Sequence, residues 1–321
     1  MMGQSIPSLR TLIPRIRDNM TFLAQFQDMK KSTYFELMCM QAFARLLKLP
    51  FFDVDHDDNS VQHRVTWNGR VSPISKAPDG PDGIARCHDF DMLVEATRKE
   101  GTKQYTQEYT RAITHWEQYL STSTTPPGSI YLLLVCTKLH ETSFNACAAR
   151  AYPIAKMIPV EFDVLLRIMT TAKLSITLTH SEIRKVLLDI YDCIPDCHDL
   201  KSFRHASVET AERWQENVLR HEKEIFLAMQ SYRAIRKLGY NLVGTSQIFN
   251  ALLSNPTVNQ YFSRLGHRFS DTDPEELYYI VSKHGFALGM NRTPAGEHLL
   301  APVPVEDFAL RCHALMEAAN Q

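Results

Sequence analysis

The chain has 321 residues, 44% hydrophobic and 22% charged, which is the composition of an ordinary globular protein with a full core. Its 35 Lys and Arg residues are balanced by 36 Asp and Glu residues, so a generally basic surface is excluded and any nucleic-acid binding must use a local patch. No run approaches the ~18 consecutive apolar residues of a membrane helix, and Arg10, Arg15 and Arg17 interrupt the region where a signal peptide would need an apolar core. We therefore expect a cytoplasmic protein without membrane contacts.

Seven cysteines are scattered along the chain, an odd number that indicates reduced thiols more than a disulfide framework. Cys193, Cys197 and His198 form a tight cluster. A structural zinc ion is one interpretation, although the two-residue spacing and the second ligand pair of zinc sites are missing. A loop cap is the alternative that we favour.

The first part of the chain predicts helices and then a hairpin. In residues 5–28 apolar side chains recur at three- and four-residue steps, so we assign 1–30 to an N-terminal helical segment. A further helix ends before Pro50. Glu36 lies near the start of that helix among apolar neighbours, where a carboxylate either complements the helix dipole or serves a site. Residues 51–76 are polar and irregular and predict a hairpin.

Three carboxylates in the stretch 81–108 are separated by equal steps of thirteen residues: Asp82, Glu95 and Glu108. Asp82 opens a short strand after a double turn, and the apolar run 90–94 predicts a second, buried strand that Glu95 closes. If the two strands pair as neighbours, the first two acids meet. Carboxylate oxygens are the ligands that hard divalent cations prefer, so the stretch predicts a metal site in outline.

The segment from Lys103 to about Leu120 predicts a helix with two distinct faces. The apolar stripe, which we expect to pack on a sheet, consists of Tyr105, Tyr109, Ala112, Ile113, Trp116 and Leu120. A polar row consists of Gln104, Glu108, Arg111 and His115. One interpretation leaves this row in water with a weak Glu108–Arg111 ion pair. In the other, Gln104 and Glu108 reach back to the strand carboxylates.

Residues 130–136 are the clearest strand in the chain, and their unbroken hydrophobicity indicates burial on both faces. This strand completes an α/β layer, so we assign 31–155 to one core domain and 156–321 to a mainly helical region. The helices predicted in that region are 162–169, 181–190, 208–238, 247–253, 274–284 and 305–319, with a short ribbon between 285 and 304.

The long helix predicted at 208–238 is rich in charge. Its basic residues include Arg213, Arg220, Arg233, Arg236 and Lys237. Basic helices in an appended region often grip a duplex, yet long charged helices are at least as often solvent-facing spacers. The sequence contains no recognisable recognition-helix signature, so both interpretations stay open.

With these residues in hand, the chain resembles the PD-(D/E)XK nuclease superfamily and, within it, the AlwI-type restriction endonucleases and related nicking enzymes. The resemblance rests on Pro81-Asp82, the strand end Val94-Glu95-Ala96-Thr97, and then Gln104 and Glu108. It covers residues 31–120 well and extends loosely through 158–163, which we expect to be helical. The chain departs from the superfamily in one respect, because Thr97 stands in the position of the usual lysine.

The resemblance implies an α/β nuclease core, a mixed sheet flanked by helices, followed by the mainly α-helical region. The catalytic set that it implies is Glu36, Asp82, Glu95, Thr97, Gln104 and Glu108. Asp82 and Glu95, with the Ala96 carbonyl, would hold the main Mg²⁺, or Mn²⁺ in its place. Glu108 and Glu36 would hold outer waters or a second ion, and Gln104 would orient them. Lys99 or Lys103 would be the substitute for the missing lysine, and the general base stays open.

The implied function is that of a divalent-metal-dependent DNA endonuclease of restriction or defence type, which hydrolyses phosphodiester bonds in double-stranded DNA. A homodimer, or a second nuclease or recognition subunit, is the expected assembly. The competing interpretation is a non-catalytic subunit of a larger complex that keeps a nuclease-like fold and binds DNA or protein. A metal-independent hydrolase is disfavoured, because the sequence contains no nucleophile elbow or paired motif.

Overall fold

The computed structural model describes residues 81–149 except 88, residues 156–175, 178–238, 242–292 and 298–300, eight positions between 35 and 47, and three between 310 and 314. The helical segment predicted at 1–30 and the hairpin predicted at 51–76 lie outside the described residues, as does most of the helix predicted at 305–319. The chain divides into two compact units. Unit 1 consists of 1–173 with 178–215, and unit 2 consists of 174–177 with 216–321.

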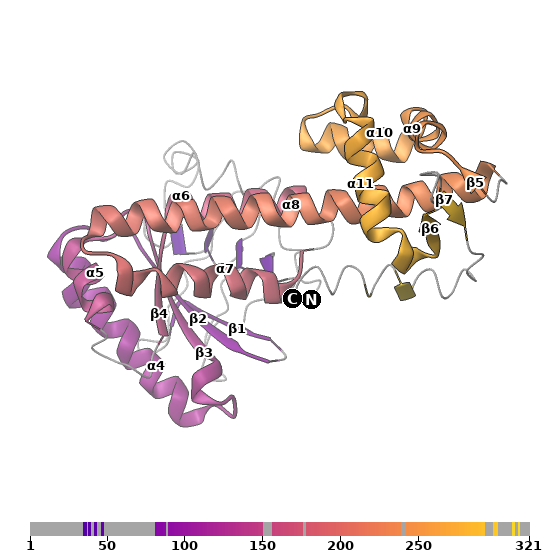
Figure 1. The fold of residues 1–321 in the computed structure, drawn as a ribbon. Coiled ribbons are helices and arrows are strands. Elements are labelled where there is room, and N and C mark those ends of the chain that lie inside the picture. Colours follow the sequence, from indigo (N-terminus) through magenta and orange to yellow (C-terminus); the bar gives the residue numbers. More distant parts are fainter. Residues whose placement is uncertain are drawn as a thin grey trace, which may run out of the picture. The chain divides into compact units, whose positions relative to one another are not determined.

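Unit 1 is built on a four-stranded mixed sheet with the order β1-β2-β3-β4 (Figure 1). β1 (Gly83–Arg86) is antiparallel to β2 (Asp91–Thr97), whereas β3 (Ile130–Cys136) and β4 (Lys156–Glu161) run parallel to β2. The carboxyl ends of β2, β3 and β4 and the amino end of β1 therefore meet along one side of the sheet. We call this side the carboxyl edge.

Helices flank the sheet of unit 1. A π-helical turn (Gln104–Tyr109) leads into α4 (Thr110–Thr122), and α5 (Glu141–Ala148) follows β3. After β4 come α6 (Phe162–Leu174), α7 (His180–Asp192) and the first part of α8 (Leu200–Leu238), which continues into unit 2. Short 3-10 turns lie at Pro127–Ser129 and Ile194–Asp196. The predicted architecture is confirmed: a mixed sheet flanked by helices, followed by a mainly helical C-terminal region.

The central strands are buried on both faces. All seven residues of β2 and all seven of β3 are buried, as expected for strands with parallel neighbours and helices on both sides. Asp91 and Glu95 of β2 meet α4, whereas the ring of Phe90 lies 5.8 Å from that of His180 on α7. Figure 1 shows α4 and α7 on opposite sides of the sheet. The strand predicted at 130–136 is confirmed.

The helix expected at 158–163 is wrong, because these residues form the end of β4 and the start of α6. Pro159 has no N–H group to donate to a neighbouring strand, which is tolerated at the edge of a sheet. β4 is the last strand of the described sheet, with β3 on its paired side. Because β4, α7 and most of α6 belong to unit 1, this unit extends beyond the boundary predicted at residue 155.

The helix predicted at 103–120 is present, but its first part is π-helical. The N–H of Thr110 bonds to the carbonyl of Tyr105, five residues earlier. A π turn holds more residues than an α turn, so it shifts the faces that a period of 3.6 predicts. The buried polar residues of the segment are Gln104, Glu108 and His115.

Over residues 216–300, the described part of unit 2 combines the end of α8 with three helices and a small antiparallel sheet. The helices are α9 (Thr245–Leu253), α10 (Pro256–Leu265) and α11 (Pro274–His284), with 3-10 turns at Phe269–Asp271 and Phe286–Leu288. The strands are β5 (Leu242–Val243), β6 (Met290–Arg292) and β7 (His298–Leu300), in the order β5-β7-β6. β6 and β7 form the ribbon predicted between 285 and 304, whereas α10 is an additional helix.

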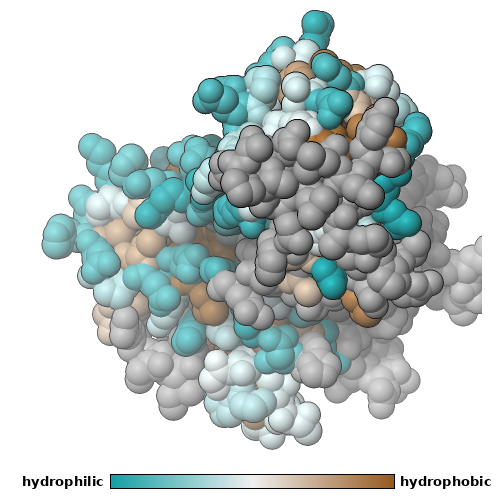
Figure 2. All heavy atoms as spheres, turned by 45° about the vertical axis from the view of Figure 1, so that its right-hand side comes forward, coloured by the Kyte–Doolittle hydropathy of each residue, from teal (hydrophilic) through white to brown (hydrophobic). Residues whose placement is uncertain are grey.

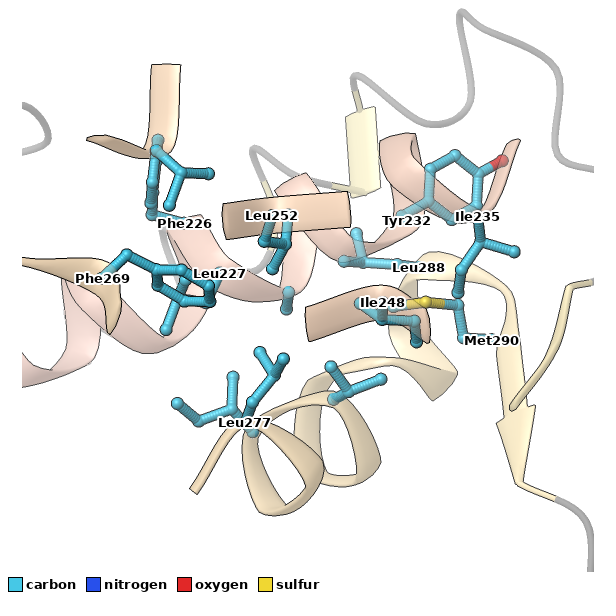
Figure 3. Close-up of a cluster of buried hydrophobic side chains, with 14 of the residues drawn as sticks. Phe226, Leu227, Tyr232, Ile235, Ile248, Leu252, Phe269, Leu277, Leu288 and Met290 are labelled. Carbon is cyan, nitrogen blue, oxygen red and sulfur yellow. The ribbon is translucent and has the colours of Figure 1, made fainter. Parts of the chain in front are cut away.

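A cluster of buried hydrophobic side chains holds unit 2 together (Figure 3). It joins Tyr232 of α8 to Ile248 of α9 and Leu277 of α11. The rings of Phe226 and Tyr261 stack within it, with their centroids 4.1 Å apart. The end of α8 is thus an integral part of this unit.

The described surface is mainly hydrophilic on the face drawn in Figure 2, and hydrophobic residues appear there in separate areas. Among the described residues, the exposed large hydrophobic side chains are Leu238, Leu253, Tyr279 and Leu310. Within the same part of the chain, no helix combines the length and apolar character needed to cross a membrane.

We expect Gly285→Ala to destabilise unit 2. A Cβ atom at this position would lie 2.3 Å from the carbonyl oxygen of Val281 and 3.1 Å from Cβ of Met290, so the backbone between α11 and β6 must shift. Overpacking of this kind costs about 1–3 kcal/mol, which thermal and urea unfolding would measure. Gly244→Ala is the matched control in the same unit, because its Cβ would meet nothing closer than 3.9 Å. Equal destabilisation of both variants would contradict this explanation.

Candidate active site

Asp82 and Glu95 come together at the carboxyl edge. Gly83 pairs with Val94, so the residue before β1 lies level with Glu95 on the antiparallel neighbour. Asp82 Oδ2 accepts a hydrogen bond from the N–H of Ala96 at 2.8 Å. The side chains of both acids are buried, with 3% of Asp82 and 1% of Glu95 exposed. β1 and β2 therefore pair as neighbours, as predicted, and this pairing brings the two acids together.

His115 holds the Glu95 carboxylate from the side of α4. Its Nδ1 lies 2.5 Å from Glu95 Oε1, and both side chains are buried. One turn further along α4, the hydroxyl of Tyr119 donates to Asp91 Oδ2 at 2.9 Å. Glu95 Oε2 is buried as well and has no hydrogen-bond partner among the described residues. Because an unsatisfied carboxylate oxygen is costly to bury, Oε2 is a position where binding of a cation would be favourable.

Glu108 forms an ion pair with Lys99, which lies two residues beyond Thr97. The Glu108 side chain is nearly buried, whereas that of Lys99 is partly exposed. Lys99 is one of the two lysines expected to act in place of the lysine that Thr97 replaces. It contacts Glu108, which belongs to the predicted catalytic set. The place of Glu108 in a metal site stays a prediction.

Gln104 is fully buried and ties two loops together. Its Nε2 donates to the carbonyl of Lys99 at 3.1 Å and to that of Lys138 at 2.9 Å. Its Oε1 accepts from the N–H of His140 at 2.8 Å. Both amide hydrogens are therefore used by the backbone, and only Oε1 has a lone pair left for the predicted role of orienting a water. The loops that follow β2 and β3 are fixed against each other by this side chain.

Thr97 shapes the turn after β2. It is buried, and its Oγ1 accepts a hydrogen bond from the N–H of Lys99 at 3.0 Å. Hydroxyl side chains commonly bond to the backbone two residues ahead in this way. Thr97 therefore orients the segment that carries Lys99.

Glu36 lies in a helical segment that packs on α6, where the ring of Phe35 is 6.1 Å from that of Phe162. Burial raises the pKa of the Cys39 thiol well above its ordinary value, and the charges of Glu36 and Cys136 raise it further. A direct role of Glu36 in the site stays a prediction.

A second anchor lies at the end of β4. Arg204 of α8 donates to both oxygens of Glu161 at 2.8 and 3.1 Å, and to the carbonyl of Leu139 at 2.7 Å. Glu161 also accepts from the N–H of Leu139 at 2.6 Å. The loop 137–140 is therefore held by Gln104 and by the Arg204–Glu161 pair.

Three participants have no signature in the sequence that assigns them a role. His115 is recognisable there only as part of a polar row, and its contact with Glu95 depends on how α4 lies along β2. Arg204 and Glu161 are 43 residues apart and belong to no local pattern. A buried carboxylate needs a partner, so a search for the partner of Glu95 is the signal that leads to His115.

The donor chemistry of the carboxyl edge suits a hard divalent cation. Mg²⁺ is usually bound by one or two protein carboxylates and keeps several waters. Asp82 and Glu95 supply such a pair, and Glu95 Oε2 has no donor among the described residues. Those residues contain no group of three or more His, Cys, Asp or Glu side chains arranged to hold a metal ion. A site here would therefore combine two carboxylates with backbone, water or substrate oxygens.

The Cys193 cluster takes part in the hydrogen bonds of a loop. Cys193 Sγ donates to the carbonyl of Asp189, and Cys197 Sγ donates to the carbonyl of Cys193, each at 3.1 Å. All six cysteines in the described residues are free. These contacts agree with the loop-cap interpretation.

We expect Gln104→Met to lower the free energy of unfolding by about 2 kcal/mol, because three partly buried backbone groups would lose their hydrogen-bond partner. Methionine has nearly the same shape, so the missing hydrogen bonds dominate the change. Gln107→Met is the matched control, since Gln107 is exposed in the same π turn. Urea unfolding should leave the control within about 0.5 kcal/mol of the wild type. A similarly small change for Gln104→Met would reject the proposed link between the loops.

Comparisons with known proteins give a distant structural likeness. No family model matches the sequence, and no curated protein matches it significantly. Among solved structures, the chain is similar to the small subunit of the heterodimeric restriction endonuclease R.BspD6I, with 15% sequence identity and a TM-score of 0.44. The similarity covers 65% of this chain and 99% of that subunit. A likeness of this degree carries no inference about activity, which has to come from the residues of the carboxyl edge.

Proposed function

We propose that this chain is a divalent-metal-dependent endonuclease of restriction or defence type that hydrolyses phosphodiester bonds in double-stranded DNA. The observation that carries the proposal is the buried pair of Asp82 and Glu95, in which Glu95 Oε2 has no hydrogen-bond donor among the described residues. Two adjacent buried carboxylates repel each other unless a cation or a proton compensates their charge. A bound divalent cation would satisfy Glu95 Oε2 and compensate the negative charge of the pair.

In the proposed site, Asp82 and Glu95 hold Mg²⁺, or Mn²⁺ in its place, with the carbonyl of Ala96 as a further oxygen ligand. Such an ion supplies an activated water at neutral pH and neutralises negative charge on the leaving oxygen. His115 is a positioning residue in this proposal. By holding Oε1, it limits the rotation of the carboxylate and keeps Oε2 available for a ligand.

The remaining members of the predicted set have supporting roles in this proposal. Glu108 and Glu36 would bind outer waters or a second ion, and Gln104 would keep the loops around the site in place. Lys99 would act for the lysine that Thr97 replaces. Its Nζ is partly exposed and paired with Glu108, so a substrate phosphate can compete for the same ammonium group.

A non-catalytic, nuclease-like subunit is the competing function. One observation favours it: Glu95 and Glu108 each already have a partner in the protein, His115 and Lys99. Acids that are paired in this way have less need of a metal ion. The two functions differ in metal affinity, so calorimetric titration of the protein with Mn²⁺ separates them independently of cleavage.

The proposed enzyme would act with a second copy of the chain or with a separate nuclease or recognition subunit, because one site cuts one strand at a time. The proposal of a second subunit rests on the proposed restriction function. Sedimentation of the protein with and without duplex DNA would detect a second copy.

We expect Asp82→Asn and Glu95→Gln each to abolish cleavage of plasmid DNA in Mg²⁺, because each removes a charged metal ligand while keeping its shape. Binding of a duplex should stay within about threefold of the wild type in Ca²⁺, which supports binding better than chemistry. Glu117→Gln is the control, since Glu117 is an exposed acid on α4. Cleavage at the wild-type rate by either site variant would show that the active site lies elsewhere.

We expect His115→Leu to lower the cleavage rate and to raise the Mg²⁺ concentration needed for half-maximal activity, each by about 10–100-fold. The reason is that Glu95 loses the group that holds its Oε1. His115→Gln, which keeps a hydrogen-bond donor, should restore part of the metal affinity. If both variants lose activity without any change in Mg²⁺ dependence, His115 does not position the metal ligand.

A further inference from the structure

One long span of unit 2 contains no acid. From Ile225 to Ser270 there is no Asp or Glu, although the whole chain has 36 of them among 321 residues. The Lys and Arg residues of this span are Arg233, Arg236, Lys237, Arg264 and Arg268. The span covers the end of α8, β5, α9 and α10. A chain that is neutral as a whole therefore has a local region whose only full charges are positive.

Six of the cations of unit 2 fall into two groups. Three form ion pairs with acids outside the span, namely Lys223 with Glu276, Lys283 with Glu224, and Arg264 with Glu222. By contrast, Arg233, Arg236 and Lys237 are exposed and have no ion pair within the described part of the chain. The second group is available to an external anion.

Arg233, Arg236 and Lys237 lie on one face at the end of α8, because residues three and four positions apart are neighbours on a helix. The other face of this turn is fixed, since Tyr232 and Ile235 are buried in the cluster drawn in Figure 3. Cations in the last turn also complement the helix dipole. That effect does not account for the absence of acids over the following 32 residues, from Gly239 to Ser270.

The helices after β5 add neutral hydrogen-bonding side chains to the region. Exposed residues of this kind on α9 and α10 include Ser246, Asn250, Gln260 and Ser263. Such side chains donate to phosphate oxygens and reach base edges in protein–DNA contacts. They add no negative charge that would repel a polyanion.

We propose that unit 2 binds double-stranded DNA through the exposed cations of this acid-free span, with Arg233, Arg236 and Lys237 contacting backbone phosphates. The identity of the polyanion rests on the proposed nuclease function, whereas the surface itself does not.

The test is fluorescence anisotropy of the full chain with a labelled duplex in EDTA, where no cleavage interferes, over a range of KCl concentrations. The triple variant Arg233→Gln, Arg236→Gln, Lys237→Gln should bind at least about tenfold more weakly near 0.1 M salt. The slope of log K against log salt should fall by about 0.9 for each phosphate that the variant no longer neutralises. The weakening should be equal for two duplexes of unrelated sequence, because phosphate contacts carry no sequence information.

A matched control removes the same charge from unit 1: Lys185→Gln, Lys201→Gln, Arg213→Gln, all at exposed positions. Its salt slope should equal that of the wild type. If the control loses as much affinity as the α8 variant, the weaker binding follows from the lower net charge alone, and the proposal is overturned. A charge-retaining variant, Arg233→Lys, Arg236→Lys, Lys237→Arg, should keep the wild-type slope, and failure to do so would also overturn it.

Two further measurements separate the outcomes. Polyglutamate that competes as well as duplex DNA for the same surface would indicate an acidic protein partner and overturn the proposal. Glu117→Gln, an exposed position on α4, should bind the duplex as tightly as the wild type in EDTA. If the wild type binds DNA in a salt-dependent way, the α8 variant does not, and no protein cleaves DNA, the DNA-binding surface is supported and the nuclease function is rejected. If DNA is cleaved and the α8 variant cleaves it as fast as the wild type at every salt concentration, the nuclease function is supported and the DNA-binding surface is rejected.

Discussion

The Glu95 carboxylate is buried at the end of β2, and the position of α4 depends on this burial. A charged group with so little exposure is tolerated only when other groups compensate it. His115 bonds one oxygen, and Tyr119 on the next turn of α4 bonds Asp91 on the same strand face. Two contacts one helical turn apart set both the distance and the direction of α4 along β2. The acid therefore determines the position of the helix as much as apolar packing does.

The loops at the carboxyl edge are held by side chains rather than by their own backbone alone. Gln104 joins the loop after β2 to the loop after β3, and Arg204 with Glu161 holds the second loop from the other side. Polar networks of this kind are rigid only when every member is satisfied. Groups that must bind a metal ion or a phosphate benefit from such support, because small displacements of catalytic groups greatly reduce rates. In the proposed nuclease, this support would keep the groups of the carboxyl edge in position for hydrolysis of a phosphodiester.

Local physics explains which parts of the fold could be predicted. The strand Ile130–Cys136 and the helix Pro274–His284 are evident in the sequence, the first from unbroken apolar residues and the second from a proline start after the Asp273 cap. β4 is misjudged because Pro159 suppresses its strand signal. α10 follows α9 after only two residues, so the two read as one irregular apolar run. The contact between His115 and Glu95 depends on tertiary alignment, which no local pattern contains.

The π turn at Gln104–Tyr109 makes the length of this segment part of the site. Each residue of an α-helix advances about 100° around the axis. The π turn contains about one residue more than an α turn, so the side chains before it are rotated by about one residue relative to those of α4. Gln104 and His115, which an uninterrupted α-helix would direct along the same line, consequently serve different partners. A homologue with one residue fewer here would have a regular helix, and its buried amide would no longer face the loop after β3. Insertions and deletions in this turn are therefore expected to be selected against more strongly than exchanges of its exposed side chains.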